Sequence, residues 1–171
     1  MKNEVPSSLF EPAIYTFSVG GKRLRPLLTL MAADLFGEDI EDAVSPAIGI
    51  EVFHNFTLLH DDLMDDADMR RGNQTVHKKW NNNTAVLSGD AMVIESYKYI
   101  SKVSPDLLPD VLEVFSNTAM DICRGQQYDM DFEERNDVTE SEYIEMIRLK
   151  TAVLLGCALK LGAMISKAPR A

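Results

Sequence analysis

The chain has 171 residues, of which 46% are hydrophobic, and its 27 acidic residues outnumber 17 basic ones to give a net charge of −10. This length and composition fit one globular domain rather than a disordered chain. The acidic balance argues against nucleic-acid binding and against a polybasic membrane anchor. No apolar run approaches the roughly 18 residues of a membrane span, and the N-terminus lacks the apolar core of a signal peptide. We therefore expect a cytoplasmic protein, with Cys123 and Cys157 as buried free thiols.

Apolar residues recur at helical spacing along the chain, and strand-like alternation is absent. Helices are expected, in chain order, over residues 12–20, 24–36, 46–66 and 84–101, then from a start between Pro105 and Pro109 to residue 128, and over 139–166. Pro12 and Pro46 are placed in the first turns of their helices, and Thr139 with Glu142 predicts a capping box. The longest connectors are expected to be irregular, at residues 67–83 and 129–137. An all-α bundle with sites between facing helices follows.

Residues 54–72 read HNFTLLHDDLMDDADMRRG, so an apolar helix runs into five aspartates. Asp61 and Asp65 are four residues apart and therefore lie on one helix face, flanked by Asp62. His54 lies two turns earlier on the same face. Stacked carboxylates destabilise a helix by a few tenths of a kcal/mol unless a cation compensates them.

The D-D-x-x-D spacing of these aspartates favours a magnesium site. Mg²⁺ binds oxygen, keeps several waters and is usually held by one or two carboxylates together with substrate phosphates. The glycine and terminal glutamate of an EF-hand calcium loop are missing. A solvated acidic helix end is the alternative, but the preceding residues are apolar and negative charge at a helix C-terminus opposes the helix dipole. Arg70 and Arg71 follow at once and indicate a phosphorylated ligand.

Residues 20–26 read GGKRLRP and form a second candidate site. Two glycines free the backbone, and Lys22, Arg23 and Arg25 could surround a diphosphate, with arginine supplying paired hydrogen bonds. The alternative is a solvated basic turn. Together with the acidic metal site, the motif favours a second, metal-free phosphate pocket.

Four other residues permit a structural as well as a functional interpretation. His54 could be a core histidine, although its place on the aspartate face favours a phosphate contact. Lys150, followed by Thr151, lies among apolar residues, where it could extend its ammonium group to solvent or reach phosphate. Gln126 lies near a polar helix end that would be unremarkable alone.

Together these motifs resemble those of the polyprenyl synthetases, the trans-isoprenyl diphosphate synthases. Residues 20–26 are similar to the family's isopentenyl-diphosphate loop, and LLHDDLMDDADMRRG at 58–72 is similar to its first aspartate-rich motif. GQQYD at 125–129 and KT at 150–151 resemble two further signatures in the same order. The resemblance implies an isoprenoid-synthase-type helical bundle, with residues 1–171 as a single all-α domain.

The resemblance also implies a role for each candidate residue. Asp61 and Asp65 would coordinate Mg²⁺ that bridges to an allylic diphosphate, supported by Asp62. The allylic diphosphate would also be contacted by Arg70, Lys150 and Thr151. Isopentenyl diphosphate would be held by Lys22, Arg25, His54 and Arg71. Gln126 and Asp129 would line or brace the metal side.

The implied reaction is Mg²⁺-dependent condensation of isopentenyl diphosphate with dimethylallyl, geranyl or farnesyl diphosphate, catalysed by a homodimer. In the family, residues just before the first aspartate-rich motif form the floor of the product pocket. Phe56 lies five positions before Asp61 and is followed by Thr57. A bulky ring there should block long chains, which predicts a short product of C15 to C20.

No second aspartate-rich motif follows Asp68, so the chain resembles the N-terminal half to two-thirds of a synthase. We expect this fragment alone to have little or no activity. One alternative is a terpene-cyclase-like enzyme, which would have no use for the GGKRLRP motif. The other is a non-catalytic or regulatory subunit of a heteromeric prenyl synthase, which would have no use for the Asp61–Asp65 pair.

Overall fold

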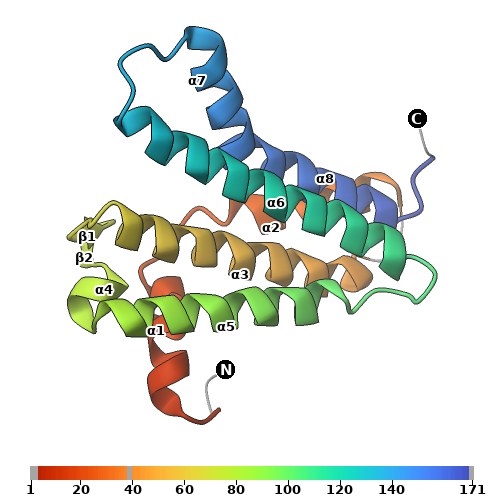
Figure 1. The fold of residues 1–171 in the computed structure, drawn as a ribbon. Coiled ribbons are helices and arrows are strands. Elements are labelled where there is room, and N and C mark those ends of the chain that lie inside the picture. The colour runs from red at the N-terminus through yellow and green to blue at the C-terminus, as the bar shows by residue number, and fades with distance from the viewer. Residues whose placement is uncertain (1–3, 38–39, 170–171) are drawn as a thin grey trace. The chain divides into compact units, whose positions relative to one another are not determined.

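The computed structural model describes residues 4–37 and 40–169, which are predominantly helical (Figure 1). The elements in chain order are α1 (Ser7–Ser18), α2 (Leu24–Leu35), α3 (Glu41–Met64), β1 (Met69–Arg70), β2 (Asn73–Gln74), α4 (Val76–Lys79), α5 (Asn82–Ile100), α6 (Leu108–Glu133), α7 (Glu140–Ile147), the π-helical turn η1 (Arg148–Ala152) and α8 (Val153–Ile165). The predicted all-α class is confirmed.

The described chain forms two compact units. The first contains residues 4–23 and 48–99, and the second contains residues 24–37, 40–47 and 100–169. Helix α3 contributes its start to the second unit and the remainder to the first. The assignment of residues 1–171 to a single domain stays a prediction.

The core of the first unit lies mainly between α3 and α5, which run side by side in Figure 1. Val52 and Leu59 of α3 face Ala85 and Met92 of α5. Each pair is spaced seven residues apart, which places both members on one face of their helix. Helices α1 and α4 each add a small buried residue to this cluster. The same packing fixes the end of α3, where the aspartates lie.

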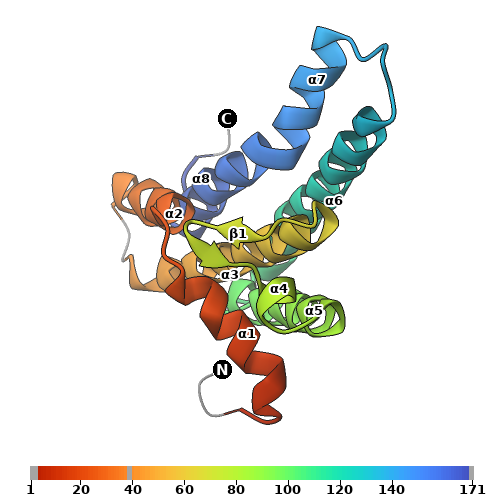
Figure 2. The same cartoon turned by 90° about the vertical axis from the view of Figure 1, so that its left-hand side faces the viewer.

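The second unit is built around the close approach of α2 to α8, visible in Figure 2. Gly162 of α8 allows this approach, because a Cβ there would lie 2.9 Å from the Cβ of Ala32 and would overlap the carbonyl oxygen of Thr29. The hydroxyl of Ser166 donates to the carbonyl of Ala33 at 3.0 Å. Small side chains therefore bring two helix backbones into contact.

The predicted starts of two helices are wrong. Pro12 lies inside α1, which begins at Ser7, and Pro46 lies inside α3, which begins at Glu41. A proline inside a helix removes one hydrogen bond and is usually unfavourable. Both rings are fully buried, and their apolar contacts offset part of that cost.

The two connectors predicted to be irregular are partly ordered. Residues 67–83 contain the hairpin of β1 and β2 and the short helix α4. These elements are too short for a periodic pattern of apolar residues to be recognised in the sequence. Helix α6 continues to Glu133, so Asp129 is helical rather than in an acidic loop. The helix expected over 139–166 is interrupted by η1.

Candidate active site

Helix α3 ends within the aspartate cluster. Asp66 adopts a left-handed conformation (φ 49°), and the amide of Ala67 donates to the carbonyl of Asp62 at 2.9 Å. These features form a Schellman-type helix end, so α3 stops at Met64, slightly before the predicted end. The amide of Asp65 still donates to the carbonyl of Asp61 at 2.9 Å, which preserves the four-residue relation between the two candidate metal ligands.

A tight hairpin carries the two arginines that follow the aspartates. Strands β1 and β2 are antiparallel, with Met69 opposite Gln74 and Arg70 opposite Asn73. The turn residues, Arg71 and Gly72, have φ of 52° and 78°. Two positive φ angles are typical of a type I′ turn, whose twist matches that of the strands. The turn reverses the chain and returns it along the end of α3.

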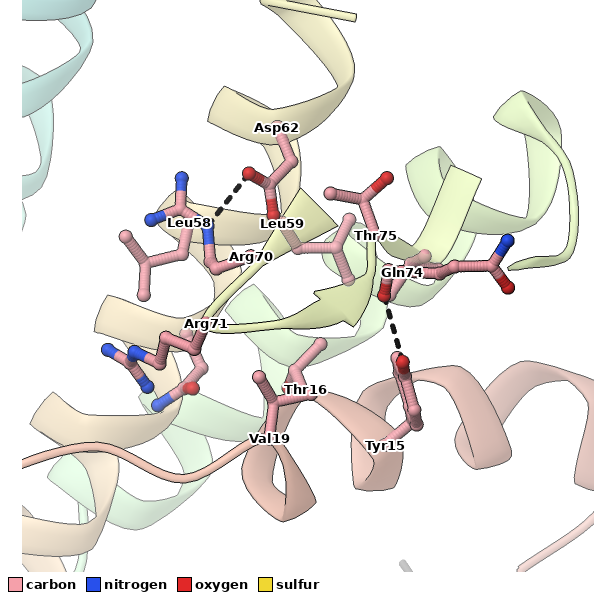
Figure 3. A pocket seen from close by; sticks show the side chains of 12 residues that line it. Tyr15, Thr16, Val19, Leu58, Leu59, Asp62, Arg70, Arg71, Gln74 and Thr75 are labelled. Atoms are coloured by element: carbon pink, nitrogen blue, oxygen red, sulfur yellow. Dashed lines mark hydrogen bonds and ion pairs between the residues drawn. The ribbon is translucent and has the colours of Figure 1, made fainter. Parts of the chain in front are cut away.

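The hairpin places Arg70 against two of the aspartates, and its contact with one of them, Asp62, is drawn in Figure 3. Its Nε donates to Oδ1 of Asp62 at 2.7 Å, and its Nη2 donates to Oδ2 of Asp61 at 3.1 Å. The side chain of Asp62 is only 8% exposed. Burial raises the pKa of this carboxyl group, and the hydrogen bond and positive charge of Arg70 act in the opposite direction. The compensating cation expected for the cluster is therefore supplied in part by the chain itself.

Two further aspartates are held by a lysine that the sequence interpretation missed. Nζ of Lys78 lies 2.8 Å from Oδ1 of Asp66 and 3.1 Å from Oδ1 of Asp68. Lys78 belongs to α4, within the segment predicted to be an irregular connector. The available signal was the run His77-Lys78-Lys79 after the acidic cluster. Four of the five aspartates thus divide by partner: Asp61 and Asp62 contact Arg70, whereas Asp66 and Asp68 contact Lys78.

The second arginine of the hairpin contacts the glycine motif. Nη1 of Arg71 donates to the carbonyl of Gly20, and a Cβ at Gly21 would lie 2.7 Å from the same nitrogen. Gly21 also has φ of 151°. The paired glycines therefore leave the space in which this guanidinium group lies.

The cations of residues 22–25 have different environments. Lys22 is exposed and Arg25 is half-buried, and they belong to different units. Arg23 forms an ion pair with Glu51 and donates from Nη2 to the carbonyl of Phe17 at 2.7 Å. Arg23 therefore fastens the loop to α1 and α3, and Lys22 and Arg25 stay the phosphate ligands predicted for this motif.

The candidate pocket-floor residues lie on α3. The ring centroid of Phe56 is 5.4 Å from that of Phe53 and 4.7 Å from that of His60. The hydroxyl of Thr57 donates to the carbonyl of His54 at 2.8 Å, and both residues are half-buried. Phe56 is consequently held between aromatic neighbours one turn before and one turn after it.

The remaining candidates lie together in the second unit. Nζ of Lys150, in η1, lies 2.5 Å from Oδ2 of Asp129 on α6. A Cβ at Gly125 would overlap the backbone of Lys150, so this glycine lets α6 approach η1 closely. The side-chain nitrogen of Gln126 is buried and has no hydrogen-bond partner among the described residues. Thr151 is exposed.

The pocket in Figure 3 lies between α1, α3 and the hairpin. The hydroxyl of Tyr15 donates to the carbonyl of Gln74 at 2.8 Å and ties the hairpin to α1. The pocket volume is about 30 Å³, which accommodates a water-sized group but not a diphosphate. The enclosed space between the hairpin and α1 is therefore of water size.

The acidic residues suit magnesium by donor type. No group of three or more His, Cys, Asp or Glu side chains is arranged as a metal site among residues 4–37 and 40–169. Mg²⁺ shared with a substrate diphosphate needs only one or two carboxylates, which Asp61 and Asp65 can provide. None of the described helices is long and apolar enough to span a membrane.

Comparison with known proteins identifies the family. A polyprenyl synthetase family model matches residues 6–171. The chain is 43% identical over 165 residues to a geranylgeranyl diphosphate synthase of Methanosarcina mazei, covering 95% of this chain and 51% of the relative. It is 42% identical over 167 residues to a geranylgeranyl pyrophosphate synthase of Geoglobus acetivorans, covering 96% and 52%. A crystal structure of a geranylgeranyl pyrophosphate synthase matches with a TM-score of 0.94 and 54% identity, covering 97% of this chain and 51% of that one. The chain spans about half the length of these relatives, and it belongs to the polyprenyl synthetase family.

Proposed function

We propose that this chain provides part of the active site of a short-chain polyprenyl diphosphate synthase. The reaction would join an allylic diphosphate to isopentenyl diphosphate and release a C15 to C20 prenyl diphosphate. The observation that carries this proposal is the hairpin that brings Arg70 to Asp61 and Asp62 while placing Arg71 on the paired glycines. The three relatives described above are named geranylgeranyl diphosphate or pyrophosphate synthases, which supports the same substrate class.

On the allylic side, Asp61 and Asp65 would hold Mg²⁺, with Asp62 as their support. The bound metal would supply positive charge to the leaving diphosphate. Arg70 already donates two hydrogen bonds to carboxylate oxygens, and phosphate oxygens accept the same paired donors. Lys150 and Thr151 would add a further cation and a hydroxyl donor for this diphosphate.

On the isopentenyl side, Arg71, Lys22, Arg25 and His54 would hold the second diphosphate without a metal. Arg71 is oriented by its contact with Gly20, and Lys22 is exposed on the neighbouring loop. Separate sites for the two diphosphates would let the allylic carbon that leaves its diphosphate meet the double bond of isopentenyl diphosphate between them.

The chemistry explains why charged groups lie at the end of apolar helices. Ionisation of the allylic C–O bond would place negative charge on the leaving diphosphate, where cationic side chains stabilise it. The double bond of isopentenyl diphosphate would then form the new C–C bond, and loss of a proton would complete the product. Water would quench the allylic cation, so apolar residues such as Phe56 and Leu58 would serve to exclude it.

The proposal is tested with the longest protein that the gene encodes. It would be incubated with Mg²⁺, isopentenyl diphosphate and each allylic diphosphate from dimethylallyl to farnesyl, and the products would be measured by mass spectrometry. We expect C15 to C20 products, and we expect Asp61→Asn to reduce turnover by about 100-fold or more. The 171-residue chain alone is expected to be almost inactive. We also expect a homodimer, which light scattering would detect.

Two other outcomes would overturn the proposal. Consumption of the allylic substrate without isopentenyl diphosphate would indicate the terpene-cyclase-like alternative. Absence of turnover until a second, different polypeptide is added, with Asp61→Asn then having no effect, would indicate a non-catalytic subunit.

A further inference from the structure

The loop that joins α3 to α4 is fastened by residues for which the proposed reaction has no role. Thr75, which is 2% exposed, donates from its hydroxyl to the carbonyl of Ala67 at 2.6 Å. The amide of Thr75 donates to the carbonyl of Asp68 at 3.1 Å. Thr75, a buried residue at the end of the loop, is therefore hydrogen-bonded to Ala67 and Asp68 at its start.

Lys78 fastens the same segment through side chains. It bridges Asp66 and Asp68, and Nε2 of His77 lies 3.4 Å from Oδ1 of Asp66. The His77 side chain is only 2% exposed, so its ring is buried beside Asp66. Asp66 is also the left-handed residue at which α3 ends.

These contacts close a loop that contains both arginines of the hairpin. On the α3 side, the amide of Ala67 is fixed to the carbonyl of Asp62. On the α4 side, Thr75 and Lys78 hold Ala67, Asp66 and Asp68. Between these points the chain forms a short, hydrogen-bonded hairpin. The contacts at the base of the loop therefore help to place Arg70 over the aspartates, together with the hydrogen bonds from Arg71 to Gly20 and from Tyr15 to Gln74.

We propose that Thr75 and Lys78, with Asp66 and Asp68, form a clasp that positions Arg70 and Arg71 for the two diphosphates. Lys78 and Thr75 are positioning residues in this assignment, because they touch the loop and not the reacting groups. Asp66 and Asp68 then serve, through Lys78, to position the arginines of the hairpin rather than to bind metal. The inference rests on the proposed function for its consequence in catalysis, whereas the clasp itself is a property of the fold.

The kinetic test compares two neighbouring lysines in the longest protein that the gene encodes. Lys78→Met removes the bridge, and Lys79→Met removes an equal charge that lies over the ring of Tyr15 and forms no ion pair with Asp66 or Asp68 among the described residues. We expect the KM values for both diphosphate substrates to rise by about tenfold in Lys78→Met, because displaced arginines weaken binding. Lys79→Met should stay within about twofold, and Lys78→Arg should restore most of the loss because a guanidinium group can also bridge two carboxylates. Asp68→Asn, a milder change at an exposed position, should shift both KM values in the same direction.

A second measurement separates this inference from the proposed function. Hydrogen exchange at the amides of Ala67 and Thr75 should be faster in Lys78→Met and unchanged in Lys79→Met, whether or not the protein turns over substrate. Unchanged exchange in Lys78→Met would show that there is no clasp. Faster exchange with unaltered KM values would show that the clasp does not position the arginines.

If the wild-type protein shows no turnover, the proposed function fails but the positioning is still measured with inorganic pyrophosphate and Mg²⁺ by calorimetry. Affinity lowered about tenfold in Lys78→Met, and not in Lys79→Met, would support the inference. Equal affinities in the two variants, or no binding by the wild type, would overturn it.

Discussion

Arg70 satisfies two carboxylates that would otherwise repel each other at the end of an apolar helix. Removal of the Arg70 side chain should therefore show by how much the uncompensated aspartates lower the free energy of unfolding. In Arg70→Met, the nearly buried carboxylate of Asp62 loses its charged partner. We expect the free energy of unfolding at pH 7 to fall by about 1–3 kcal/mol, as measured by urea denaturation.

A matched substitution provides the control for Arg70. Arg124 forms an exposed pair with Asp121 within α6, and Arg124→Met should change stability by less than about 0.5 kcal/mol. The loss in Arg70→Met should also shrink as the pH falls, because protonation of Asp62, whose pKa burial raises, removes the uncompensated charge. Equal losses in the two variants would contradict the assignment of Arg70 as the partner of Asp62.

Phe56 provides the residue-scale prediction for product length. Its ring lies between those of Phe53 and His60, so its truncation removes bulk at a defined place. We expect Phe56→Ala to lengthen the products, which chromatography of the dephosphorylated alcohols would show. Phe132→Ala, in the other unit, should leave the length distribution unchanged. An unaltered distribution in Phe56→Ala would count against the floor assignment.

At this scale the sequence predicted residue types better than their partners. Asp61, Asp65, Arg70 and Arg71 could be selected as candidates because their spacing carries the chemistry. The pairing of Lys78 with Asp66 and Asp68 could not be, because it depends on the hairpin turn between them. A periodicity argument applies only within one element, and this contact joins two.

Among the elements, the turn η1 depends on how closely α6 approaches it. A Cβ at Gly125 would overlap the backbone of Lys150, whereas a Cβ at Gly156 of α8 would meet no atom within 4 Å. We expect Gly125→Ala to destabilise the protein by about 1–3 kcal/mol through overpacking. Gly156→Ala should stabilise it by about 0.5–1 kcal/mol, because alanine is the better helix former. Urea denaturation of both variants measures the contrast, and the same sign in both would contradict the close approach.

The start of α7 gives a prediction that depends on pH. Thr139 and Glu142 form the predicted capping box, with the amide of Thr139 donating to Glu142 at 2.8 Å. These hydrogen bonds, with a further one from Arg135, lower the pKa of Glu142 from 4.5 to about 2. Its contribution to stability is therefore present above pH about 4.5 and is lost as the pH falls through about 2.

The pKa of Glu142 can be measured by NMR titration of its carboxyl group. Thr139→Ala should raise that pKa toward the ordinary value and cost about 1 kcal/mol of stability at neutral pH. An unchanged titration in this variant would show that the cap is not the cause of the shift.

The ends of helices could be predicted where local hydrogen bonding or backbone preference determines them. They could not be predicted where tertiary burial determines them. The capping box at Thr139 and the helix end before Gly37 follow from hydrogen bonding and from glycine's freedom. Pro12 and Pro46 misled the sequence interpretation because their buried rings are tolerated inside helices. The interruption at η1 depends on contact with α6, which no local pattern encodes.

For the molecule as a whole, the helical class and the family could be inferred from composition and from four ordered motifs. The division into two units could not, because helix α3 runs through both without a linker or a change in composition. The small residues at the crossing of α2 and α8 also carry no motif, although they determine that packing. A motif can be recognised in one sequence because its residue types and spacing suit a particular chemistry. Helix packing depends on side-chain volumes at positions far apart in the chain, and one sequence does not show which of these positions meet.

At Arg71, the residue that would be best for stability differs from the residue that the proposed function needs. The left-handed backbone of Arg71, at φ of 52°, is a conformation that asparagine or glycine adopts with less strain. A programme that selected only for heat resistance would therefore be drawn to replace this arginine, and it would discard the side chain that reaches Gly20. Engineers who seek a hardier version of this protein should hold that position fixed and look for gains elsewhere, for instance at Gly156.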